Sequence, residues 1–519
     1  MPSQPKAIVI GAGIGGLAAA LRLAHAGLDV TVLERHSHVG GKIRAFDSVA
    51  GPVDAGPTVL TLRAVFEQLF ADVGETLSDH VRLEPLQVLA RHFWPDGTQL
   101  DLSADTNISA TNIAHAFGEA SASDYRKFAA SIAQLFAAFD GPMMQAAQPR
   151  QSDLTRVVMR NPSLIKAMAP HRTLAQHLRQ QFGDARLAQL YGRYATYVGG
   201  SPFQSPALLG LIAHAEAAGV WQVPGGLTRL PKAIARLAQQ RGARVICDTD
   251  VTDVSGSNGD FTVTTPDRQY RADLVVFNGD PRALSTGTLG AMPKSAVPPQ
   301  GVEPRSLSAC VLAFAARVTG PSLSHHNVFF GETLRGEFDA LAAGHIPEDA
   351  TLYLCAQDRS GPRSTEQPER FELIMNAPPG ANPTDQEKQQ CLTQIFRRLA
   401  LFGLTFDPVP GLNALTTPTE FHHLFPASQG ALYGRSPHGM TAALKRPTAR
   451  SKVAGLYLVG GGAHPGAGVP MATLSARHAA EAILNDLPLT STWRPTAMPG
   501  GTLTGSATTE PKPSRLSVS

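Results

Sequence analysis

The fold of this chain is constrained most strongly by residues 7–34, which read AIVIGAGIGGLAAALRLAHAGLDVTVLE. The apolar run at 6–10 has the length and composition of a buried parallel strand. It leads into a G-x-G-x-x-G sequence, after which apolar residues recur at helical spacing. Gly27 ends this helix, and a second apolar strand covers 29–33. The pattern predicts a strand–helix–strand unit that holds the phosphates of a dinucleotide.

The glycines of this motif have separate physical roles. Gly11 permits the tight turn, Gly13 lets backbone N–H groups approach a pyrophosphate, and Gly16 lets the helix pack closely on the strand, with Gly15 in the same loop. The helix start supplies partial positive charge to the phosphates. Glu34 ends the second strand, 18 residues after Gly16, where its carboxylate can accept hydrogen bonds from an adenosine ribose.

A secretory signal is the alternative interpretation of the same segment, because Lys6 precedes an apolar stretch. However, glycines and Arg22 interrupt this stretch early. No run of about 18 uncharged apolar residues follows it. We therefore expect neither a cleaved signal peptide nor a membrane-spanning helix.

Composition narrows the class of protein. A length of 519 residues predicts two or more domains, and a net charge of +3 gives no general case for nucleic-acid binding. The four cysteines are scattered, which is typical of a reducing compartment. The doublets His325-His326 and His422-His423 lack Cys, Asp or Glu at ligand spacing, so we expect no metal site.

Three separated stretches predict one discontinuous α/β domain of the Rossmann type. The second stretch has a Gly-Gly turn, a helix and strands at 244–247, 250–254, 261–265 and 274–277, and the third has a strand at 455–459 and a helix at about 472–484. The more variable segments between them predict an inserted mixed α+β substrate domain, and a Pro, Gly, Ser and Thr-rich tail predicts disorder. The predicted parts are 1–89, 221–289 and 441–487 for nucleotide binding, 90–220 and 290–440 for substrate, and 488–519 for the tail.

Features after the first motif favour FAD over a nicotinamide cofactor. Gly40 and Gly41 place a second glycine turn beside the pyrophosphate, where Lys42 and Arg44 would add positive charge. A solvated basic pair is the alternative for these two side chains. A nicotinamide dehydrogenase must release its cofactor and would not need such wrapping.

Two further features agree with a flavin. Gly56 and Pro57 bring backbone amides past a planar ring, and Glu34 would repel the 2′-phosphate of NADP. A helix beginning near Pro470 or Met471 would direct its N-terminal dipole at the isoalloxazine, which gains negative charge on reduction.

The motifs together resemble the bacterial carotenoid (phytoene-type) desaturases, which have a flavin amine oxidase-like architecture. The resemblance rests on GAGIGG, VGGKIR, DAGPT, VPGGLTRLPKAIARLA, NGDP and GGGAHPGAGVPMA, in this order from about residue 5 to 486. Residues 193–216 and 325–341 are similar to the subgroup of 1-hydroxycarotenoid 3,4-desaturases. The turn at 460–463 reads Gly-Gly-Gly-Ala, where the family more usually has Gly-x-Gly-Thr.

The resemblance implies the activity and further cofactor contacts. It implies an FAD-dependent enzyme that introduces the 3,4 double bond into 1-hydroxy or 1-methoxy acyclic carotenoids such as hydroxyneurosporene, with oxygen or a quinone as electron acceptor. Val251 would meet the adenine through its backbone, and Gly462, Val469 and Met471 would approach the flavin.

No catalytic residue follows from the sequence. Hydride loss from an allylic carbon requires an acceptor in the right geometry, and a proton must then leave the neighbouring carbon. His464, Glu337 and Asp339 can be named as bases, but a structural role is the simpler interpretation of each.

A water-insoluble substrate implies delivery from a bilayer. Residues 150–182 carry six basic residues against one acid, with apolar residues between them, which suits peripheral contact with anionic headgroups at the cytoplasmic face of the inner membrane. A basic segment packed on the core is an equal alternative. Residues 203–220 would line a tunnel mouth or belong to the core.

Rival functions remain open at this point. Within the family these are phytoene or neurosporene desaturation and carotenoid isomerisation. An amine oxidase would need an aromatic cage, which 8 tyrosines and 3 tryptophans without a pair beside the last motif do not suggest. A non-enzymatic lipid carrier on the same fold would not need an intact flavin site.

Overall fold

The computed structural model describes residues 4–359 and 367–490. The three predicted nucleotide-binding stretches meet in one parallel sheet with the order β20-β13-β1-β2-β9. Its strands are β1 (Lys6–Ile10), β2 (Asp29–Leu33), β9 (Arg244–Ile246), β13 (Leu274–Phe277) and β20 (Leu456–Leu458). The apolar residues of β20, β13, β1 and β2 are buried on both faces, as expected for a parallel sheet, whereas Val245 and Ile246 of the edge strand β9 are half-buried.

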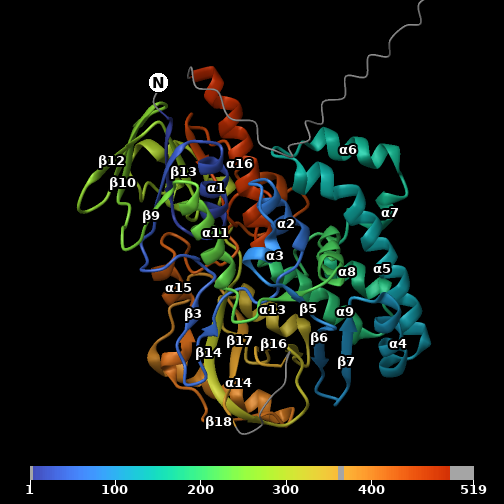
Figure 1. The fold of residues 1–519 in the computed structure, drawn as a ribbon. Coiled ribbons are helices and arrows are strands. Elements are labelled where there is room, and N and C mark those ends of the chain that lie inside the picture. The colour runs from blue at the N-terminus through green and yellow to red at the C-terminus, as the bar shows by residue number, and fades with distance from the viewer. Residues whose placement is uncertain (1–3, 360–366, 491–519) are drawn as a thin grey trace, which may run out of the picture.

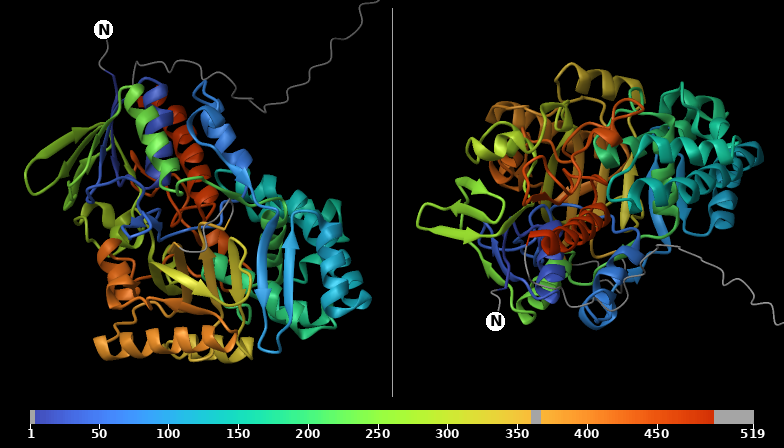
Figure 2. Two further views of the ribbon diagram at one scale, coloured as in Figure 1. Left: turned by 60° about the horizontal axis from the view of Figure 1, so that its bottom comes forward. Right: turned by 90° about the horizontal axis from the view of Figure 1, so that it is seen from above.

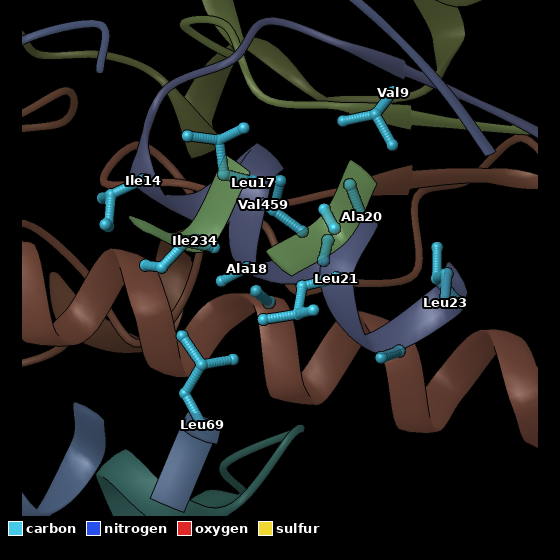
Figure 3. Close-up of a cluster of buried hydrophobic side chains, with 14 of the residues drawn as sticks. Val9, Ile14, Leu17, Ala18, Ala20, Leu21, Leu23, Leu69, Ile234 and Val459 are labelled. Carbon is cyan, nitrogen blue, oxygen red and sulfur yellow. The ribbon is translucent and has the colours of Figure 1, made fainter. Parts of the chain in front are cut away.

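Helix α1 (Ile14–His25) is packed between α11 (Arg229–Gln240) and α16 (Val469–Thr490) on one side of this sheet. Leu17 and Leu21 of α1 are fully buried and lie near Ile234 of α11, as Figure 3 shows. The helix is rich in alanine, and these small side chains let both neighbouring helices approach closely. This packing fixes the start of α1 above the carboxyl end of β1.

A second sheet of eight strands lies below the first in Figure 1, with the order β18-β14-β17-β16-β15-β6-β7 and β19 paired to β14. Its strands are β6 (Val88–Phe93), β7 (Gln99–Ser103), β14 (Ser308–Thr319), β15 (His326–Phe329), β16 (Leu352–Ala356), β17 (Glu369–Ala377), β18 (Thr405–Asp407) and β19 (Leu415–Thr416). One face packs Leu373 and Met375 against α14 (Asp385–Leu401). The alternating residues Glu372 and Ile374 therefore lie on the opposite face.

Three small sheets complete the β-structure. A three-stranded antiparallel sheet extends from the side of the molecule in Figure 2, and the other two small sheets are antiparallel pairs of two strands each. Their strands are β10 (Asp253–Ser257), β11 (Asp260–Thr264) and β12 (Gln269–Ala272), then β3 (Ala45–Phe46) with β4 (Val53–Asp54), and β5 (Glu84–Pro85) with β8 (Trp221–Gln222).

A helical layer covers the β6–β7 side of the second sheet (Figure 1). Its helices are α4 (Thr106–Phe117), α5 (Glu119–Phe139), α6 (Gln151–Arg160), α7 (Leu164–Met168), α8 (Leu174–Gln181), α9 (Ala185–Gly192) and α10 (Ile212–Ala217). The remaining helices are α2 (Arg63–Ala71), α3 (Leu77–His80), α12 (Arg282–Ser285), α13 (Leu334–Ala342) and α15 (Pro418–Leu424). Leu209 and Ile212 pack against the core of this layer. For these two residues this agrees with the expectation that 203–220 belong to the core. Among the described helices, none has the length and apolar character needed to cross a membrane.

The predicted α/β fold class is confirmed, with local differences. Of the strand expected at 250–254, residues 250–252 do not form a strand, and β10 begins only at Asp253. The N–H groups of Asp248 and Thr249 donate to the carbonyls of His36 and Glu34 and hold the chain beside the end of β2. The last helix begins at Val469 and continues to Thr490, three residues into the predicted tail, and 491–519 lie outside the described residues. Strand β6 crosses the predicted boundary at 89/90.

Candidate cofactor-binding and active site

A cavity of about 550 Å³ opens at the carboxyl ends of the parallel strands. This is the edge at which open α/β sheets bind their ligands. Most of the predicted cofactor residues line it, although they come from five separate segments of the chain. These are Gly11, Gly13, Gly15, Glu34, Gly40, Gly41, Lys42, Gly56, Pro57, Val251, Gly462 and Val469.

The first glycine turn has the predicted geometry. Gly11 has a φ of +98°, which favours glycine, and its N–H donates to the Leu33 carbonyl. A Cβ on Gly16 would lie 2.1 Å from the Gly11 carbonyl oxygen. Gly16 does not line the cavity, so its role is the close contact between helix and strand. No side chain caps the start of α1 at Gly13, which leaves the helix N-terminus open to a ligand.

Asn278 is a central residue that sequence reasoning missed. It follows β13 and lines the cavity, and its Nδ2 donates to the Gly11 carbonyl at 3.0 Å. A Cβ on Gly15 would lie 2.8 Å from its Oδ1. The asparagine therefore joins the ends of two adjacent strands. Its position at the end of a short apolar strand, in NGDP, was a usable signal.

The second glycine turn lies directly against the first. The Gly40 N–H donates to the Ala12 carbonyl at 2.9 Å, and Gly13 and Gly40 form a parallel bridge. A Cβ on Gly56 would lie 2.0 Å from the Lys42 carbonyl oxygen, so the third segment passes equally close. The backbone of these turns, rather than their side chains, therefore encloses the cavity in the predicted way.

Glu34 is 4% exposed and borders the cavity. Its Oε2 accepts from the Ala12 N–H at 2.6 Å, and its Oε1 accepts from the His36 N–H at 2.9 Å. A carboxylate has about four acceptor sites, so two backbone donors leave capacity for a ligand hydroxyl. The carboxylate is held firmly while it can still accept from a ribose.

The two predicted basic side chains, Lys42 and Arg44, lie in different surroundings. Lys42 borders the cavity and has accessible surface there. Its ammonium group nevertheless lies among protein atoms, and this burial lowers the pKa of Lys42 to about 8. Its Nζ donates to the Leu432 carbonyl at 2.5 Å. Arg44 is buried outside the cavity lining, where its Nη2 donates to Thr416 Oγ1 at 2.9 Å and its guanidinium lies over Phe421.

The C-terminal segment places Gly462 and Val469 in the lining but not Met471. Arg446, which the sequence analysis did not identify, holds this segment. Its Nη1 donates to the Gly461 carbonyl at 3.0 Å and its Nη2 to the Tyr433 carbonyl at 2.9 Å. Burial lowers the pKa of Arg446 to about 10. No sequence motif marked Arg446, because its partners are backbone groups of distant turns.

The three residues named as bases have structural surroundings. His464 is buried and its Nε2 hydrogen-bonds the Ala146 carbonyl at 2.9 Å. Glu337 accepts from Asn376 Nδ2 at 2.8 Å, away from the cavity, and Asp339 is exposed beside Arg335. Within the described ranges, none of the three borders the cavity.

One histidine doublet has a cysteine neighbour that the sequence did not reveal. His326 of β15 faces Cys355 of β16 in register, and Cys355 Sγ lies 3.5 Å from His325 Nε2. Potential ligand atoms of the three side chains lie within 4.8 Å of one another. Sequence spacing did not reveal this neighbour, because Cys355 comes from another strand. The expectation of no metal site stays a prediction.

The residues of the cavity fit FAD. An uncapped helix N-terminus and two bare glycine turns suit a pyrophosphate, and Glu34 suits a ribose. Gly462 and Val469, at the start of α16, also line the cavity, and the N-terminal dipole of this helix suits the ring of a flavin.

Comparison with known proteins agrees with this geometry. The family model for flavin containing amine oxidoreductases matches residues 14–484. The chain is 53% identical to a hydroxyneurosporene desaturase of Cereibacter sphaeroides over 93% of this chain and 98% of that protein. It is 28% identical to a 1-hydroxycarotenoid 3,4-desaturase of Flavobacterium sp. over 92% of this chain and 99% of that protein.

A solved structure supports the fold. Cyclohexylamine oxidase from Brevibacterium oxydans superposes with a TM-score of 0.56 at 18% identity, over 94% of this chain and 100% of that chain. At this identity the likeness concerns the fold alone. The chain therefore belongs to the flavin containing amine oxidoreductase family and within it to the carotenoid desaturases, and it is an oxidoreductase whose cofactor is FAD.

Proposed function

We propose that this enzyme introduces the C3,4 double bond into 1-hydroxy or 1-methoxy acyclic carotenoids, such as hydroxyneurosporene. The observation that carries the proposal is 53% identity to a hydroxyneurosporene desaturase along nearly the whole of both chains. The relative of Flavobacterium, whose name specifies 1-hydroxycarotenoid 3,4-desaturation, supports the position of the new bond.

The residues of the cavity would hold the cofactor in separate parts. Gly11, Gly13, Gly40 and Gly41 would approach the pyrophosphate, with Lys42 as the nearby cation. Glu34 would accept from the ribose hydroxyls, and Val251 would border the adenine. Gly56, Pro57, Gly462 and Val469 would enclose the flavin ring. Gly15 and Gly16 allow close contacts between backbone segments around this site, whereas Arg44 contacts Thr416 outside the cavity lining.

FAD, when bound, supplies a two-electron acceptor for hydride from an allylic carbon. The chain itself has to place that carbon, exclude water and let the second hydrogen leave as a proton. The apolar side chains Val311, Ile374 and Leu432 border the cavity on the side of the second sheet. An apolar wall of this kind suits a hydrocarbon substrate. Oxygen or a quinone would accept the electrons that reoxidise the enzyme.

We also propose that α6 and α7 make the peripheral contact with the membrane, at the cytoplasmic face of the inner membrane. Both helices lie at an outer edge of the helical layer (Figure 1). Val157 and Val158 pack inward on α5, but Met159 is 75% exposed and Ile165 is 49% exposed. Exposed basic residues flank them at positions 150, 156, 160, 166 and 172. Basic and apolar side chains on one exposed segment suit anionic headgroups.

The proposed activity is tested with the FAD-loaded full chain on liposomes. Phytoene, neurosporene and 1-hydroxyneurosporene are supplied separately, and products are resolved by chromatography and absorption spectra. A red-shifted product from the hydroxylated substrate supports the proposal. Product from phytoene alone would move the enzyme to an earlier desaturation, and a product with an unchanged number of double bonds would indicate an isomerase.

A further inference from the structure

A second cavity lies directly beside the first and has a different lining. It has a volume of about 260 Å³, and we call it the polar cavity because Asp54, Thr58, His325 and Cys355 line it together with Trp221. Pro57 borders the FAD cavity, and the next residue, Thr58, borders the polar cavity. Consecutive Cα atoms are about 3.8 Å apart, so the two cavities adjoin at this segment.

The Thr58 hydroxyl is held in place by a short hydrogen-bonded chain. Thr58 Oγ1 lies 2.6 Å from the Tyr353 hydroxyl, which lies 2.7 Å from His326 Nδ1. Tyr353 and His326 lie diagonally to each other on the neighbouring strands β16 and β15, where Tyr353 pairs with Val328. Thr58 therefore presents a fixed hydroxyl oxygen, with one further hydrogen-bonding position free for a ligand.

His325 supplies a second polar atom at the same cavity. It is 9% exposed, and its Nε2 faces Cys355 Sγ at 3.5 Å. Its Nδ1 is buried and has no hydrogen-bond partner among residues 4–359 and 367–490. Burial lowers the pKa of His325 to about 4, so the ring is neutral at neutral pH and Nδ1 can donate or accept according to tautomer. Buried polar atoms usually have a partner, which makes this one a candidate for ligand contact.

The geometry of the proposed substrate requires a polar contact at this position. In a 1-hydroxycarotenoid only C2 lies between the hydroxyl-bearing C1 and C3, a carbon of the new double bond. The hydroxyl oxygen is thus three bonds from a reacting carbon, and whatever binds it must lie beside the flavin. The polar cavity meets this condition, because it adjoins the FAD cavity at residues 57–58.

We propose that the polar cavity receives the hydroxylated end of the substrate, with Thr58 Oγ1 and His325 Nδ1 as the hydrogen-bond partners of the substrate hydroxyl. This inference rests on the proposed function and assigns it a source of specificity. A hydroxyl donates and accepts, so it satisfies both atoms. A hydrocarbon end would fill the same space, leave His325 Nδ1 without a partner and leave the further hydrogen-bonding position of Thr58 Oγ1 unused. This is how a binding site rejects a substrate that lacks a polar group.

Matched substitutions test the proposal in the FAD-loaded full chain. Thr58→Val removes the hydroxyl at nearly constant shape and Thr58→Ser keeps it, while His325→Phe removes the polar ring atoms and His325→Asn keeps a hydrogen-bonding group. Thr351→Val, outside the lining of the polar cavity, is the control. The quantity measured is kcat/KM for 1-hydroxyneurosporene divided by kcat/KM for neurosporene on liposomes.

The expected result is a ratio about three- to tenfold lower in Thr58→Val and His325→Phe, mainly through a higher KM for the hydroxylated substrate. Thr58→Ser, His325→Asn and the control should keep most of the ratio. Flavin absorbance per protein is measured first for every variant. If His325→Phe loses flavin, the comparison of Thr58→Val with Thr58→Ser tests the inference. A wild-type ratio near one, or an unchanged ratio in Thr58→Val, overturns the inference. Wild-type protein that desaturates neither substrate contradicts the proposed function instead.

Discussion

The imidazole rings of His464 and His478 lie stacked, with centroids 5.8 Å apart and 16° between their planes. His464 Nε2 hydrogen-bonds the Ala146 carbonyl at 2.9 Å, and His478 Nε2 hydrogen-bonds the Met144 carbonyl at 3.0 Å. A carbonyl only accepts, so each Nε2 carries the proton of a neutral ring. The pair fastens the segment that follows α5, at residues 144–146, to the flavin-side turn and to α16.

This pair predicts a loss of stability in mild acid. Burial lowers the pKa of His478 to about 4 and lowers that of His464. The unfolded state, with a histidine pKa of about 6.5, therefore binds more protons between pH 4 and 6.5, so the free energy of unfolding falls as pH decreases through this window. The lowered pKa of His478 changes the free energy of unfolding by at most about 3 kcal/mol across this window. Thermal unfolding across this range should show a smaller fall in His478→Gln than in wild type or in the exposed control His345→Gln. Equal slopes in all three proteins would refute the role of the pair.

Gly16→Ala should disrupt the cofactor site through the backbone. The added Cβ would lie 2.1 Å from the Gly11 carbonyl oxygen, so α1 must move away from β1. Such overpacking costs about 1–3 kcal/mol and shifts the helix N-terminus. We expect a lower Tm and little bound flavin, measured as flavin absorbance per protein. Gly141→Ala is the control, because no atom lies within 4 Å of its added Cβ. Normal flavin content in Gly16→Ala would show that the close contact is dispensable.

Glu34→Arg tests the ribose contact. The substitution removes the acceptor of the Ala12 and His36 N–H groups and places a cation where a ribose hydroxyl would donate. Hydrogen bonds to a charged group contribute about 1.5–3 kcal/mol, so FAD affinity should fall about ten- to a hundredfold. Glu34→Gln keeps an acceptor oxygen, so its FAD affinity should fall less than that of Glu34→Arg. The measurement is FAD titration of the apoprotein, and retention equal to wild type in Glu34→Arg would remove Glu34 from the site.

The residues that sequence alone could identify belong to continuous motifs. The turn after β1, the acid at the end of β2 and the later glycine turns follow from short-range patterns of apolar runs and glycines, and the structure places nearly all of them around one cavity. Arg44 and Met471 differ because a motif fixes the path of the backbone but not the direction of each side chain. Arg44 is directed toward Thr416 of β19, a contact between distant segments.

The features that the sequence could not predict depend on strand register. His326, Cys355 and Glu372 form one row across β15, β16 and β17, although they come from three separate parts of the chain. Shifting one strand by a single residue would turn its side chain to the other face, and no local pattern fixes that register. The polar cavity beside this row was therefore outside the reach of sequence motifs.

Glu372 in this row predicts a loss of stability at high pH. It is fully buried, and within the described part of the chain neither carboxyl oxygen has a hydrogen-bond partner. Burial, and then the charge of Asp54, raise its pKa well above the usual range. A raised pKa in the folded state stabilises the protein below the unfolded value of about 4.3, and this contribution is lost as pH rises through the folded value.

Glu372→Gln should remove this dependence, because the amide is uncharged at every pH. We expect Glu372→Gln to unfold less easily than wild type at pH 9, by about 1–3 kcal/mol, and to differ little at pH 5. Chemical denaturation at the two pH values measures the difference. Glu119→Gln on the surface is the control. If the free energy of unfolding of Glu372→Gln fell between the two pH values as much as that of wild type, the effect would belong to other groups.

The proposed membrane contact predicts charge-dependent binding to vesicles. Arg156 and Arg160 are exposed on α6 beside Met159. Each basic residue near an anionic surface contributes about 1 kcal/mol, so Arg156→Glu with Arg160→Glu should weaken binding to anionic liposomes at least about tenfold, and wild-type binding should fall with added salt. Lys232→Glu with Arg236→Glu makes the same change of net charge on the exposed face of α11. Cosedimentation separates the two outcomes. Equal weakening by both pairs would mean that net charge governs binding, whereas a selective loss in the α6 pair would locate the contact at this helix.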